Sequence, residues 1–544
     1  MQGLMMEVPL TLTHVFERGT GLYPRQEVVT QRAKGPPRRA TFAEVGERTR
    51  RLARALHDCG VRPGDRVATL AWNTQEHLEC YFAVPCMGAV LHTLNFRLHP
   101  DQLAYVIADA KDRVIVCQQS LLPLLAAIAD RIPSVRQVIC FGEGDAPGPG
   151  LPEVAGYEAL LAAADGPLPW PRLDERQAAG LCHTSATTGD PKGVLYSHRS
   201  SYLHALTCLT ASIFPGGLSD ADVLLPVVPM FHVNGWGQPH ACMFAGAGMV
   251  MPDRFLDPGH LLHLLAAERV TIACGVPSVW WPLLERLDAE PTRLPRLRAI
   301  LCGGSAAPPA LLQGFDRHRL TMVHAWGMTE TSPLGTVALV KHDLRGRLGP
   351  AEQLRLRATQ GLPAPGVELR LADLATGEPC PHDGRREGEL QVRGPWVCRG
   401  YAGSDDRSAF TDDGWLRTGD VATIDPEGYL RIVDRTTDLV KSGGEWISSV
   451  TLESLLMGHP DVAEAAVVGR PDVRWGERPV AFVVARGETQ GRLTAESLRD
   501  HLRPHVASFW LPDAVRFVDA LPKTGVGKFD KRALRRTLLA AEPA

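Results

Sequence analysis

The segment from residue 184 to residue 193 combines hydroxyl side chains, glycines and a lysine directly after an apolar run. It reads Thr184-Ser-Ala-Thr-Thr-Gly-Asp-Pro-Lys-Gly193, so hydroxyls, successive backbone N–H groups and the Lys192 charge can face one concavity. That combination suits a polyphosphate. The glycine spacing is not that of a Walker A loop, and Pro191 prevents a helix from starting directly after it. On this segment alone, a phosphate cradle and a Ser/Thr-rich surface turn both stay open.

Two further segments follow apolar runs and offer flat or polar surfaces. In Gly303-Gly-Ser-Ala-Ala-Pro308, small side chains let a planar ring lie against the backbone. In His324-Ala-Trp-Gly-Met-Thr-Glu330, Trp326 offers an aromatic face to a planar ring and Thr329 a hydroxyl, with a buried core tryptophan as the alternative interpretation. Glu330 would repel a phosphate group unless a cation stood between them, and Mg²⁺ is held by one carboxylate, waters and phosphate oxygens.

Three other segments carry isolated polar groups. Gly414-Trp-Leu-Arg-Thr-Gly-Asp420 places an acid after a glycine turn, and Phe231-His-Val-Asn-Gly-Trp236 combines aromatic groups with one imidazole. Near the C-terminus, Pro522-Lys-Thr-Gly-Val-Gly-Lys528-Phe-Asp-Lys-Arg532 is rich in lysine. An exposed turn aspartate, a core histidine and a solvated basic tail are the alternatives to functional roles.

The sequence pattern predicts an α/β scaffold for these segments. A chain of 544 residues is long enough for several subdomains around a large site. Helical spacing at Phe42–Cys59 and a short strand at Arg66–Ala71 predict α/β layers on a parallel sheet. Similar alternation predicts a helix at Leu261–Glu268 and strands at Thr271–Cys274 and Ala299–Cys302.

The predicted secondary-structure pattern changes in the last third of the chain. Between Gly361 and Tyr429, short strands with Gly, Pro and Asp turns predict an antiparallel, barrel-like subdomain. From about Arg435 onward, the pattern predicts a small α+β unit of roughly a hundred residues. The predicted fold class is therefore α/β, with a large layered N-terminal part, a β-barrel-like subdomain and a small C-terminal α+β domain.

The composition excludes several classes of protein. With 44% hydrophobic residues, 22% charged residues and a net charge of -3, the chain is typical of a globular protein that does not coat nucleic acid. The longest strongly apolar run, around Ala241–Pro252, is shorter than the roughly 20 residues that cross a bilayer. The N-terminus lacks the pattern of a secretory signal, so we expect a cytoplasmic protein. Its 12 cysteines include no Cys-x-x-Cys pair, which predicts buried free thiols.

Taken together, these motifs resemble those of the acyl-adenylate-forming (ANL) superfamily over nearly the whole chain. The resemblance extends to one branch, the bacterial medium- and long-chain fatty-acid:CoA ligases. It rests on the 184–198 segment and on Pro226-Val-Val-Pro-Met-Phe-His-Val-Asn234, Trp326-Gly-Met-Thr-Glu330 and Lys441-Ser-Gly-Gly-Glu-Trp-Ile447. It implies MgATP and CoA as co-substrates, an acyl-AMP intermediate, and an acyl-CoA product. A homodimer is also expected by resemblance.

The resemblance assigns roles residue by residue. Catalytic roles fall to Lys528, Glu330 and Thr184, and the last two would also hold Mg²⁺. The nucleotide would contact Thr184, Ser185, Thr187, Thr188, Lys192, Gly304, Ser305, Ala306, His324, Ala325, Trp326, Gly327, Thr329, Asp420, Arg435, Lys441 and Lys528. The acyl group and CoA would contact His232, Val233, Trp236, Gly303, Gly443, Gly444 and Trp446.

The resemblance also implies a domain division and a movement. Residues 1–434 would form the large adenylation domain and residues 435–544 the small mobile domain, with a hinge at 434–439. Lys528 would reach the substrate carboxylate and the α-phosphate during adenylation. Rotation about the hinge would then bring the 441–446 segment to the site, where its glycines allow the pantetheine arm to pass.

Three positions depart from the family pattern. Ala186 stands where glycine is usual, and a left-handed backbone there would cost on the order of 1–2 kcal/mol and misplace phosphate donors. His183 stands where tyrosine is common, and Thr437 where many relatives have lysine.

The sequence leaves other activities open. The acceptor could be a carrier protein or oxygen, but we expect no appended carrier domain because the given chain ends soon after Lys528. The acid could be a small sulfur-containing or aromatic one, although no charged group in the acyl-pocket segments offers a partner for a charged tail. A nucleotide- or acyl-binding sensor, weakened at Ala186, is the alternative from another class.

Overall fold

The structure of this chain is a computed structural model. It describes residues 1, 3–142, 151, 153–184, 190–442, 445–487, 493–523 and 529–540, and the side chains of all of these except residues 445, 539 and 540.

The first sheet ends in a hairpin that contains the candidate phosphate segment. Its strand order is β7-β6-β5-β3-β4-β8-β9. The strands are β3 (Arg66–Leu70), β4 (Val90–Thr93), β5 (Val114–Gln118), β6 (Gln137–Phe141), β7 (Glu153–Gly156), β8 (Ala178–His183) and β9 (Gly193–Ser197). Neighbouring strands are parallel except β8 and β9, whose antiparallel pairing places Thr184, after β8, and Lys192, before β9, at the same end of the hairpin.

The second sheet brings the glycine- and tryptophan-containing segments together. Its strand order is β16-β15-β14-β13-β12-β10-β11-β1-β2. The strands are β1 (Glu27–Thr30), β2 (Arg38–Thr41), β10 (Val223–Pro226), β11 (Gly248–Met251), β12 (Ile272–Gly275), β13 (Ala299–Cys302), β14 (Met322–Trp326), β15 (Thr336–Val337) and β16 (Leu362–Pro363). Strands β10 to β14 are parallel, so the segments that follow β13 and β14 emerge at the same edge.

Helices connect these strands. They are α1 (Leu12–Leu22), α2 (Phe42–Asp58), α3 (Gln75–Cys86), α4 (Pro100–Ala110), α5 (Leu122–Ala126), α6 (Tyr157–Ala163), α7 (His198–Cys208), α8 (Gln238–Ala245), α9 (Pro258–Ala267), α10 (Pro277–Ala289), α11 (Pro309–Arg317), α12 (His342–Arg347) and α13 (Pro350–Arg357). Capping side chains determine where several of these helices start. A capping box between Thr41 and Glu44 begins α2, and the Asp257 side chain accepts a hydrogen bond from the His260 N–H at the start of α9.

The two sheets and their helices stack in layers. Successive strand residues point to opposite faces, so Val67 and Leu224 enter a core between the sheets that also contains α1, α2, α3, α7 and α8. Ala68 faces an outer core with α4 and α5, and Leu225 faces another with α9, α10 and α11. A helical layer therefore separates the sheets, and each sheet has a second helical layer outside it.

The C-terminal third contains two antiparallel-rich sheets. One has the order β17-β18-β19-β20, from β17 (Glu368–Ala372), β18 (Gly388–Arg393), β19 (Leu416–Ile424) and β20 (Leu430–Arg435). The other has the order β22-β21-β24-β23, with β25 beside β24. Its elements are β21 (Val440–Ser442), β22 (Glu445–Ile447), β23 (Val462–Asp472), β24 (Gly476–Ala485), β25 (Ala514–Phe517), α14 (Ser449–Met457), α15 (Ala495–Leu502) and α16 (Lys531–Ala540).

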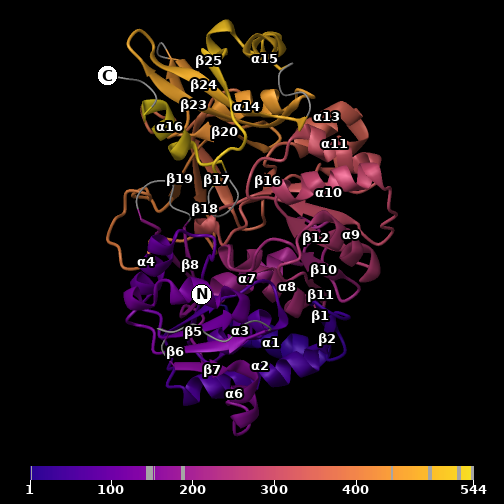
Figure 1. Ribbon diagram of the computed structural model, residues 1–544, viewed down its shortest axis with the longest axis vertical. Coiled ribbons are helices and arrows are strands. Elements are labelled where there is room, and N and C mark those ends of the chain that lie inside the picture. Colours follow the sequence, from indigo (N-terminus) through magenta and orange to yellow (C-terminus); the bar gives the residue numbers. More distant parts are fainter. Residues whose placement is uncertain are drawn as a thin grey trace.

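Figure 1 shows β23, β24, β25 and helices α14 to α16, in orange and yellow, at the end of the molecule opposite to α2 and α6, with β17, β18 and β19 nearer the middle. The predicted fold class is confirmed. Helix α9 starts three residues earlier than predicted because Asp257 caps it and Pro258 suits its first turn. All 12 cysteines are free, and most of them are buried, as predicted. No helix among the described residues has the length and apolar character of a membrane span.

A buried carboxylate ties three helices of the N-terminal part together. The Glu79 side chain on α3 is fully buried and accepts hydrogen bonds from Arg48 of α2 at 2.7 Å and from the Tyr157 hydroxyl of α6 at 2.5 Å. Burial raises the pKa of Glu79, against the opposing effect of the Arg48 charge. The guanidinium is therefore the group that allows this carboxylate to be charged in the core.

We expect Arg48→Met to lower the free energy of unfolding by about 3–5 kcal/mol, because a buried carboxylate would lose its cation. Urea unfolding followed by circular dichroism measures the loss. Arg51→Met on the same helix is the control. It removes an exposed pair with Glu47 and should cost less than about 1 kcal/mol. Equal losses for the two variants would contradict this account of Glu79.

Candidate active site

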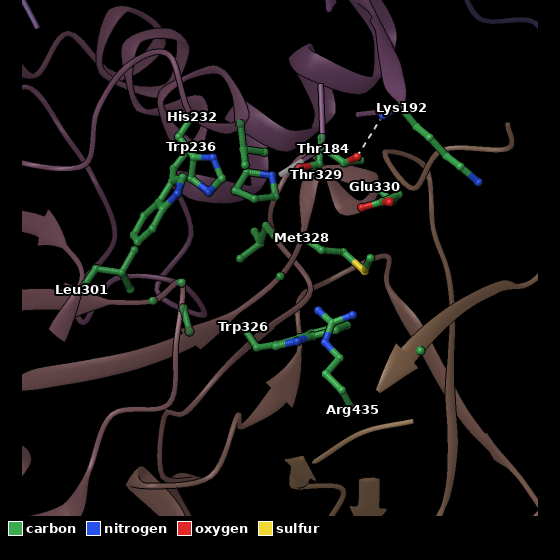
Figure 2. Close-up of a pocket in the computed structure, with 18 of the residues that line it drawn as sticks. Thr184, Lys192, His232, Trp236, Leu301, Trp326, Met328, Thr329, Glu330 and Arg435 are labelled. Atoms are coloured by element: carbon green, nitrogen blue, oxygen red, sulfur yellow. Dashed lines mark hydrogen bonds between the residues drawn. The ribbon is translucent and has the colours of Figure 1, made fainter. Parts of the chain in front are cut away.

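A cavity of about 970 Å³ lies where the ends of both large sheets meet the C-terminal elements. Residues of the 184–192 hairpin loop line one side, and the segments after β13 and β14 line another (Figure 2). The remaining wall comes from α7, α8, the end of β20 and the start of α16. The cavity therefore joins most of the segments that the sequence singled out.

Hydrogen bonds close the base of the hairpin between β8 and β9. We call residues 184–192 the phosphate hairpin, after their predicted ligand. The Thr184 N–H donates to the Lys192 carbonyl at 2.9 Å, and the Lys192 N–H donates to the Thr184 hydroxyl at 3.0 Å (Figure 2). Both residues line the cavity. Ser185, Ala186, Thr187 and Thr188 lie outside the described residues.

The Lys192 amine is held at the side of the cavity. It lies 3.3 Å from an Asp406 carboxylate oxygen and 4.8 Å from the centre of the Tyr401 ring. Figure 2 shows its side chain extending away from His232 and Trp236. Both contacts are partly exposed and weak enough for a phosphate group to compete with them.

Close backbone packing shapes the segment after β14. A Cβ atom on Gly327 would lie 1.4 Å from the Pro333 carbonyl oxygen, and one on Gly335 would lie 2.5 Å from the Trp326 ring. The Thr331 hydroxyl donates to the Pro333 carbonyl at 2.7 Å. Glycine at these positions lets the chain double back, which places Trp326 and Thr329 on the cavity wall.

His324 supports this segment from behind. Its Nδ1 lies 2.7 Å from the Thr359 carbonyl oxygen, which fixes Nδ1 as the protonated nitrogen of a neutral ring. Burial lowers the pKa of His324, so the ring stays neutral near pH 7.

Glu330 sits beside the phosphate hairpin with one oxygen already bonded. The Tyr401 hydroxyl donates to Oε1 at 2.8 Å, and the side chain is almost fully buried. Burial and the neighbouring Glu330 carboxylate raise the pKa of Tyr401, so it keeps its proton as a donor. Tyr196 donates to the Thr329 carbonyl at 2.7 Å and steadies the turn.

These donors fit a magnesium ion bound together with phosphate groups. Among the described residues, no cluster of three His, Cys, Asp or Glu side chains forms a complete metal site. Glu330 provides a carboxylate and Thr184 a hydroxyl, and both line the cavity. Such hard oxygen donors, few in number, match the way Mg²⁺ binds when phosphate oxygens and waters complete its shell.

The segment that carries Trp236 has an unusual backbone. Val233, Asn234, Gly235 and Trp236 all have positive φ, between 37° and 60°. For residues with a Cβ, such angles cost energy and persist only where the surroundings enforce them. Trp236 in turn packs over Gly303, where a Cβ would lie 3.0 Å from the indole. His232, Val233 and Trp236 all line the cavity.

Asn234 supplies that enforcement. Its Oδ1 accepts hydrogen bonds from Thr93 of β4 at 2.9 Å and from the Cys182 thiol of β8 at 2.8 Å. Its backbone N–H donates to the same sulfur at 3.2 Å. Burial raises the pKa of Cys182 to about 11, so the sulfur remains a thiol that can donate.

The end of β20 forms the wall nearest the C-terminal elements. Arg435 lines the cavity and contacts Asp420 of β19, with Nε 2.7 Å from Oδ1. The Asp420 side chain is buried and does not line the cavity in the described part of the chain. Thr437, at the position where the sequence departs from the family, also lines the cavity.

The start of α16 reaches the same cavity. Phe529, Asp530, Lys531 and Arg532 line it, whereas Lys528 lies outside the described residues. The Lys531 amine is buried, 2.7 Å from Glu453 and 2.6 Å from the Ser449 hydroxyl. The residues that directly follow Lys528 therefore adjoin the cavity.

Several predicted residues lie elsewhere. Lys441 and Trp446 face each other across the β21–β22 hairpin, with the amine 5.2 Å from the ring centre. Neither lines the cavity in the described part of the chain, and Ser305, Ala306 and His324 do not line it either. Gly443 and Gly444 lie outside the described residues. Gly303, Gly304, Ala325, Trp326, Gly327 and Thr329 do line it.

Sequence patterns did not indicate some lining residues. Tyr401 belongs to no motif and reaches Glu330 only through the fold. His204 and Gln238 are polar residues on α7 and α8 that line the cavity beside apolar side chains. The sequence signal that could have identified His204 and Gln238 is the presence of a polar residue on a helix face that is otherwise apolar and buried.

Comparisons with known proteins agree with this geometry. The family described as "AMP-binding enzyme" matches residues 16–402, and the "AMP-binding enzyme C-terminal domain" matches residues 451–528. The chain is 47% identical to a long-chain-fatty-acid–CoA ligase of Thermus thermophilus, over 98% of this chain and 96% of that protein. It is 43% identical to a 3-methylmercaptopropionyl-CoA ligase of Ruegeria lacuscaerulensis, over 98% of each chain.

Solved structures share the fold. An anthranilate CoA ligase in complex with anthranoyl-AMP superposes with a TM-score of 0.85 at 24% identity, covering 98% of this chain and 99% of that chain. The o-succinylbenzoate coenzyme A synthetase of Bacillus subtilis, in complex with ATP and magnesium, gives 0.79 at 26% identity, covering 96% and 99%.

We expect Gly327→Ala to lower the free energy of unfolding by about 1–3 kcal/mol or more, because the new Cβ would overlap the Pro333 carbonyl. Thermal or urea unfolding measures the change. Gly346→Ala in α12 is the control, since no atom lies within 4 Å of its added Cβ and alanine favours a helix. A Gly327→Ala protein as stable as the parent would refute the close-packing argument.

Proposed function

The chain belongs to the AMP-binding enzyme family and is an ATP-dependent acyl-CoA ligase, and from that premise we propose that it activates straight-chain fatty acids. The observation that carries the proposal is an apolar wall of the cavity, formed by residues of the α7–β10 loop, β10, α8 and β13. We define the apolar wall as Ile213, Phe214, Leu218, Leu224, Ala241 and Leu301.

No described lining residue of α7, the α7–β10 loop, β10, α8 or β13 is Asp, Glu, Lys or Arg. The charged lining residues belong to the phosphate hairpin, the Glu330 turn, the β20 end and α16. A hydrocarbon chain suits the first region, and a polyphosphate suits the second. A substrate with a charged tail would find no partner along the apolar wall.

In the proposed first step, the fatty-acid carboxylate attacks the α-phosphorus of ATP, and pyrophosphate leaves. Lys528 would contact the carboxylate and the α-phosphate, while Thr184 and Lys192 would face the other phosphate groups. Trp326 and Gly304 would flank the adenine, and Asp420 with Arg435 would face the ribose. Glu330 and Thr184 would hold Mg²⁺, which offsets phosphate charge when bound.

In the proposed second step, the thiolate of CoA attacks the acyl-AMP carbonyl, and AMP leaves with its phosphate. The small domain, residues 435–544, would rotate about residues 434–439 and withdraw Lys528. The hairpin with Lys441, Gly443, Gly444 and Trp446 would then reach the cavity. Such a movement is needed because neither Lys441 nor Trp446 lines the cavity in the described part of the chain.

Acid-dependent pyrophosphate release from MgATP tests the substrate class. A panel should contain straight-chain acids of increasing length, 3-methylmercaptopropionate and an aromatic acid, with and without CoA. We expect kcat/KM for the best straight-chain acid to exceed that of the other two by about tenfold or more, since each buried CH₂ contributes about 0.8 kcal/mol. A preference for the sulfur-containing or aromatic acid would overturn the proposal.

The departure at Ala186 is tested in the same assay with Ala186→Gly. If the parent chain releases pyrophosphate at a rate similar to that of the variant, the parent chain is an active ligase. If only the variant releases pyrophosphate, the parent chain is a binding protein, in keeping with the sensor alternative.

We expect Lys528→Ala to abolish acid-dependent pyrophosphate release while preserving thioester formation from supplied acyl-AMP, because only adenylation would use this amine. Lys523→Ala is the matched control, since Lys523 lies in the same segment and pairs with Glu464 at 2.5 Å outside the cavity. Equal loss of both half-reactions in Lys528→Ala would exclude the division of roles.

A further inference from the structure

A tyrosine in the loop between β18 and β19 connects two groups at the charged end of the cavity. Tyr401 lines the cavity together with Glu330, from the turn after β14, and Lys192, directly before β9. Its hydroxyl donates to Glu330 Oε1 at 2.8 Å, and its ring centre lies 4.8 Å from the Lys192 amine. One side chain therefore contacts both the candidate magnesium ligand and the candidate phosphate-binding cation.

Backbone hydrogen bonds hold this loop against both of its neighbours. The Cys398 N–H donates to the Glu330 carbonyl at 2.8 Å, and the Ala402 N–H donates to the Gly193 carbonyl at 2.8 Å. Tyr401 directly precedes Ala402, so its backbone cannot shift far without breaking the contact with β9. The hydroxyl therefore meets the Glu330 carboxylate from a defined direction.

The two carboxylate oxygens of Glu330 have different surroundings. A carboxylate only accepts hydrogen bonds, so the Tyr401 hydroxyl is the donor to Oε1. Oε2 accepts no hydrogen bond from the described residues, and it is not among the buried polar atoms that lack both a partner and solvent contact. Because the side chain lines the cavity, Oε2 is the oxygen that remains for a cation there.

The number of oxygens that a carboxylate offers affects which cation it suits. Mg²⁺ is small, keeps several of its waters, and is usually bound through one or two carboxylates together with phosphate oxygens. Ca²⁺ is larger, takes about six to eight oxygens, and readily accepts both oxygens of one carboxylate. A carboxylate with one oxygen held by a hydroxyl is poorly suited to that second mode.

We propose that Tyr401 is a positioning residue that restricts Glu330 to coordination through Oε2, and that the nucleotide site therefore prefers Mg²⁺ over Ca²⁺. This inference rests on the proposed function, since it requires Glu330 to bind the metal. Tyr401 acts through Glu330 and not on the reacting atoms. The hydroxyl carries the role, and the ring alone does not.

Isothermal titration calorimetry with α,β-methylene-ATP tests the proposal without turnover, because the bridge between the α- and β-phosphorus of this analogue cannot be cleaved. The dissociation constant is measured with Mg²⁺, with Ca²⁺ and without a divalent ion. We expect the parent chain to bind the analogue about tenfold or more tightly with Mg²⁺ than with Ca²⁺. Tyr401→Phe should lower that ratio about fivefold or more, since it frees Oε1 and keeps the ring.

Tyr196→Phe is the matched control. The Tyr196 hydroxyl donates to the Thr329 carbonyl at 2.7 Å, so the variant removes a donor to the residue directly before Glu330 without freeing a carboxylate oxygen. Its Mg²⁺-to-Ca²⁺ ratio should stay within about twofold of the parent ratio. An unchanged ratio in Tyr401→Phe, or an equal change in Tyr196→Phe, would overturn the inference. A parent chain without a preference for Mg²⁺ would overturn it even if Tyr401→Phe does not fold.

Glu330→Gln separates this inference from the proposed function. If the variant loses the increase in affinity that the metal causes, while Tyr401→Phe keeps the parent ratio, only the role of Tyr401 is contradicted. If binding to Glu330→Gln depends on the metal as strongly as binding to the parent chain, the proposed metal role of Glu330 is contradicted instead.

Discussion

The hydrogen bonds that Asn234 makes to Thr93 and Cys182 connect the two large sheets directly next to the cavity-lining residue Val233. Thr93 and Cys182 belong to the first sheet, whereas Asn234 follows the end of β10 in the second. The same bonds maintain the left-handed backbone that places Trp236 over Gly303. The phosphate hairpin starts two residues after Cys182. The positions of the hairpin and of the tryptophan are therefore coupled through Asn234.

A second constraint is the separation of charge within a single cavity. Charged side chains come from the loops and the C-terminal elements, while the described lining residues of helices α7 and α8 and strands β10 and β13 include no Asp, Glu, Lys or Arg. This arrangement follows from the fold. Loops at the ends of parallel strands can present polar groups to a ligand, whereas helices packed between two sheets must be apolar on most sides. A molecule that is charged at one end and apolar at the other therefore has one orientation in which both ends make favourable contacts with the cavity.

Sequence patterns identified the layered fold, and they singled out several segments that line the cavity, because those signals are local. Thr184 and Lys192 lie at the ends of the connection between β8 and β9, the glycine-containing segment follows β13, and Trp326 ends β14. What the patterns could not indicate depends on distant partners. Gly327 is needed because of the Pro333 carbonyl, and Tyr401 matters because it meets Glu330 from a loop 71 residues away. Likewise, the contact of His204 with Gly237 depends on how α7 packs against the turn before α8, which periodicity alone does not define.

The run of positive φ angles at residues 233–237 also has a consequence for divergence among related chains. Replacing any one residue there disturbs angles that its neighbours share, so single substitutions are penalised before they can alter the ligand. Ile213, Phe214 and Leu218 have ordinary backbone angles and border the same space. We expect natural variation in acid preference to accumulate first in the loop between α7 and β10, with the strained turn inherited almost unchanged.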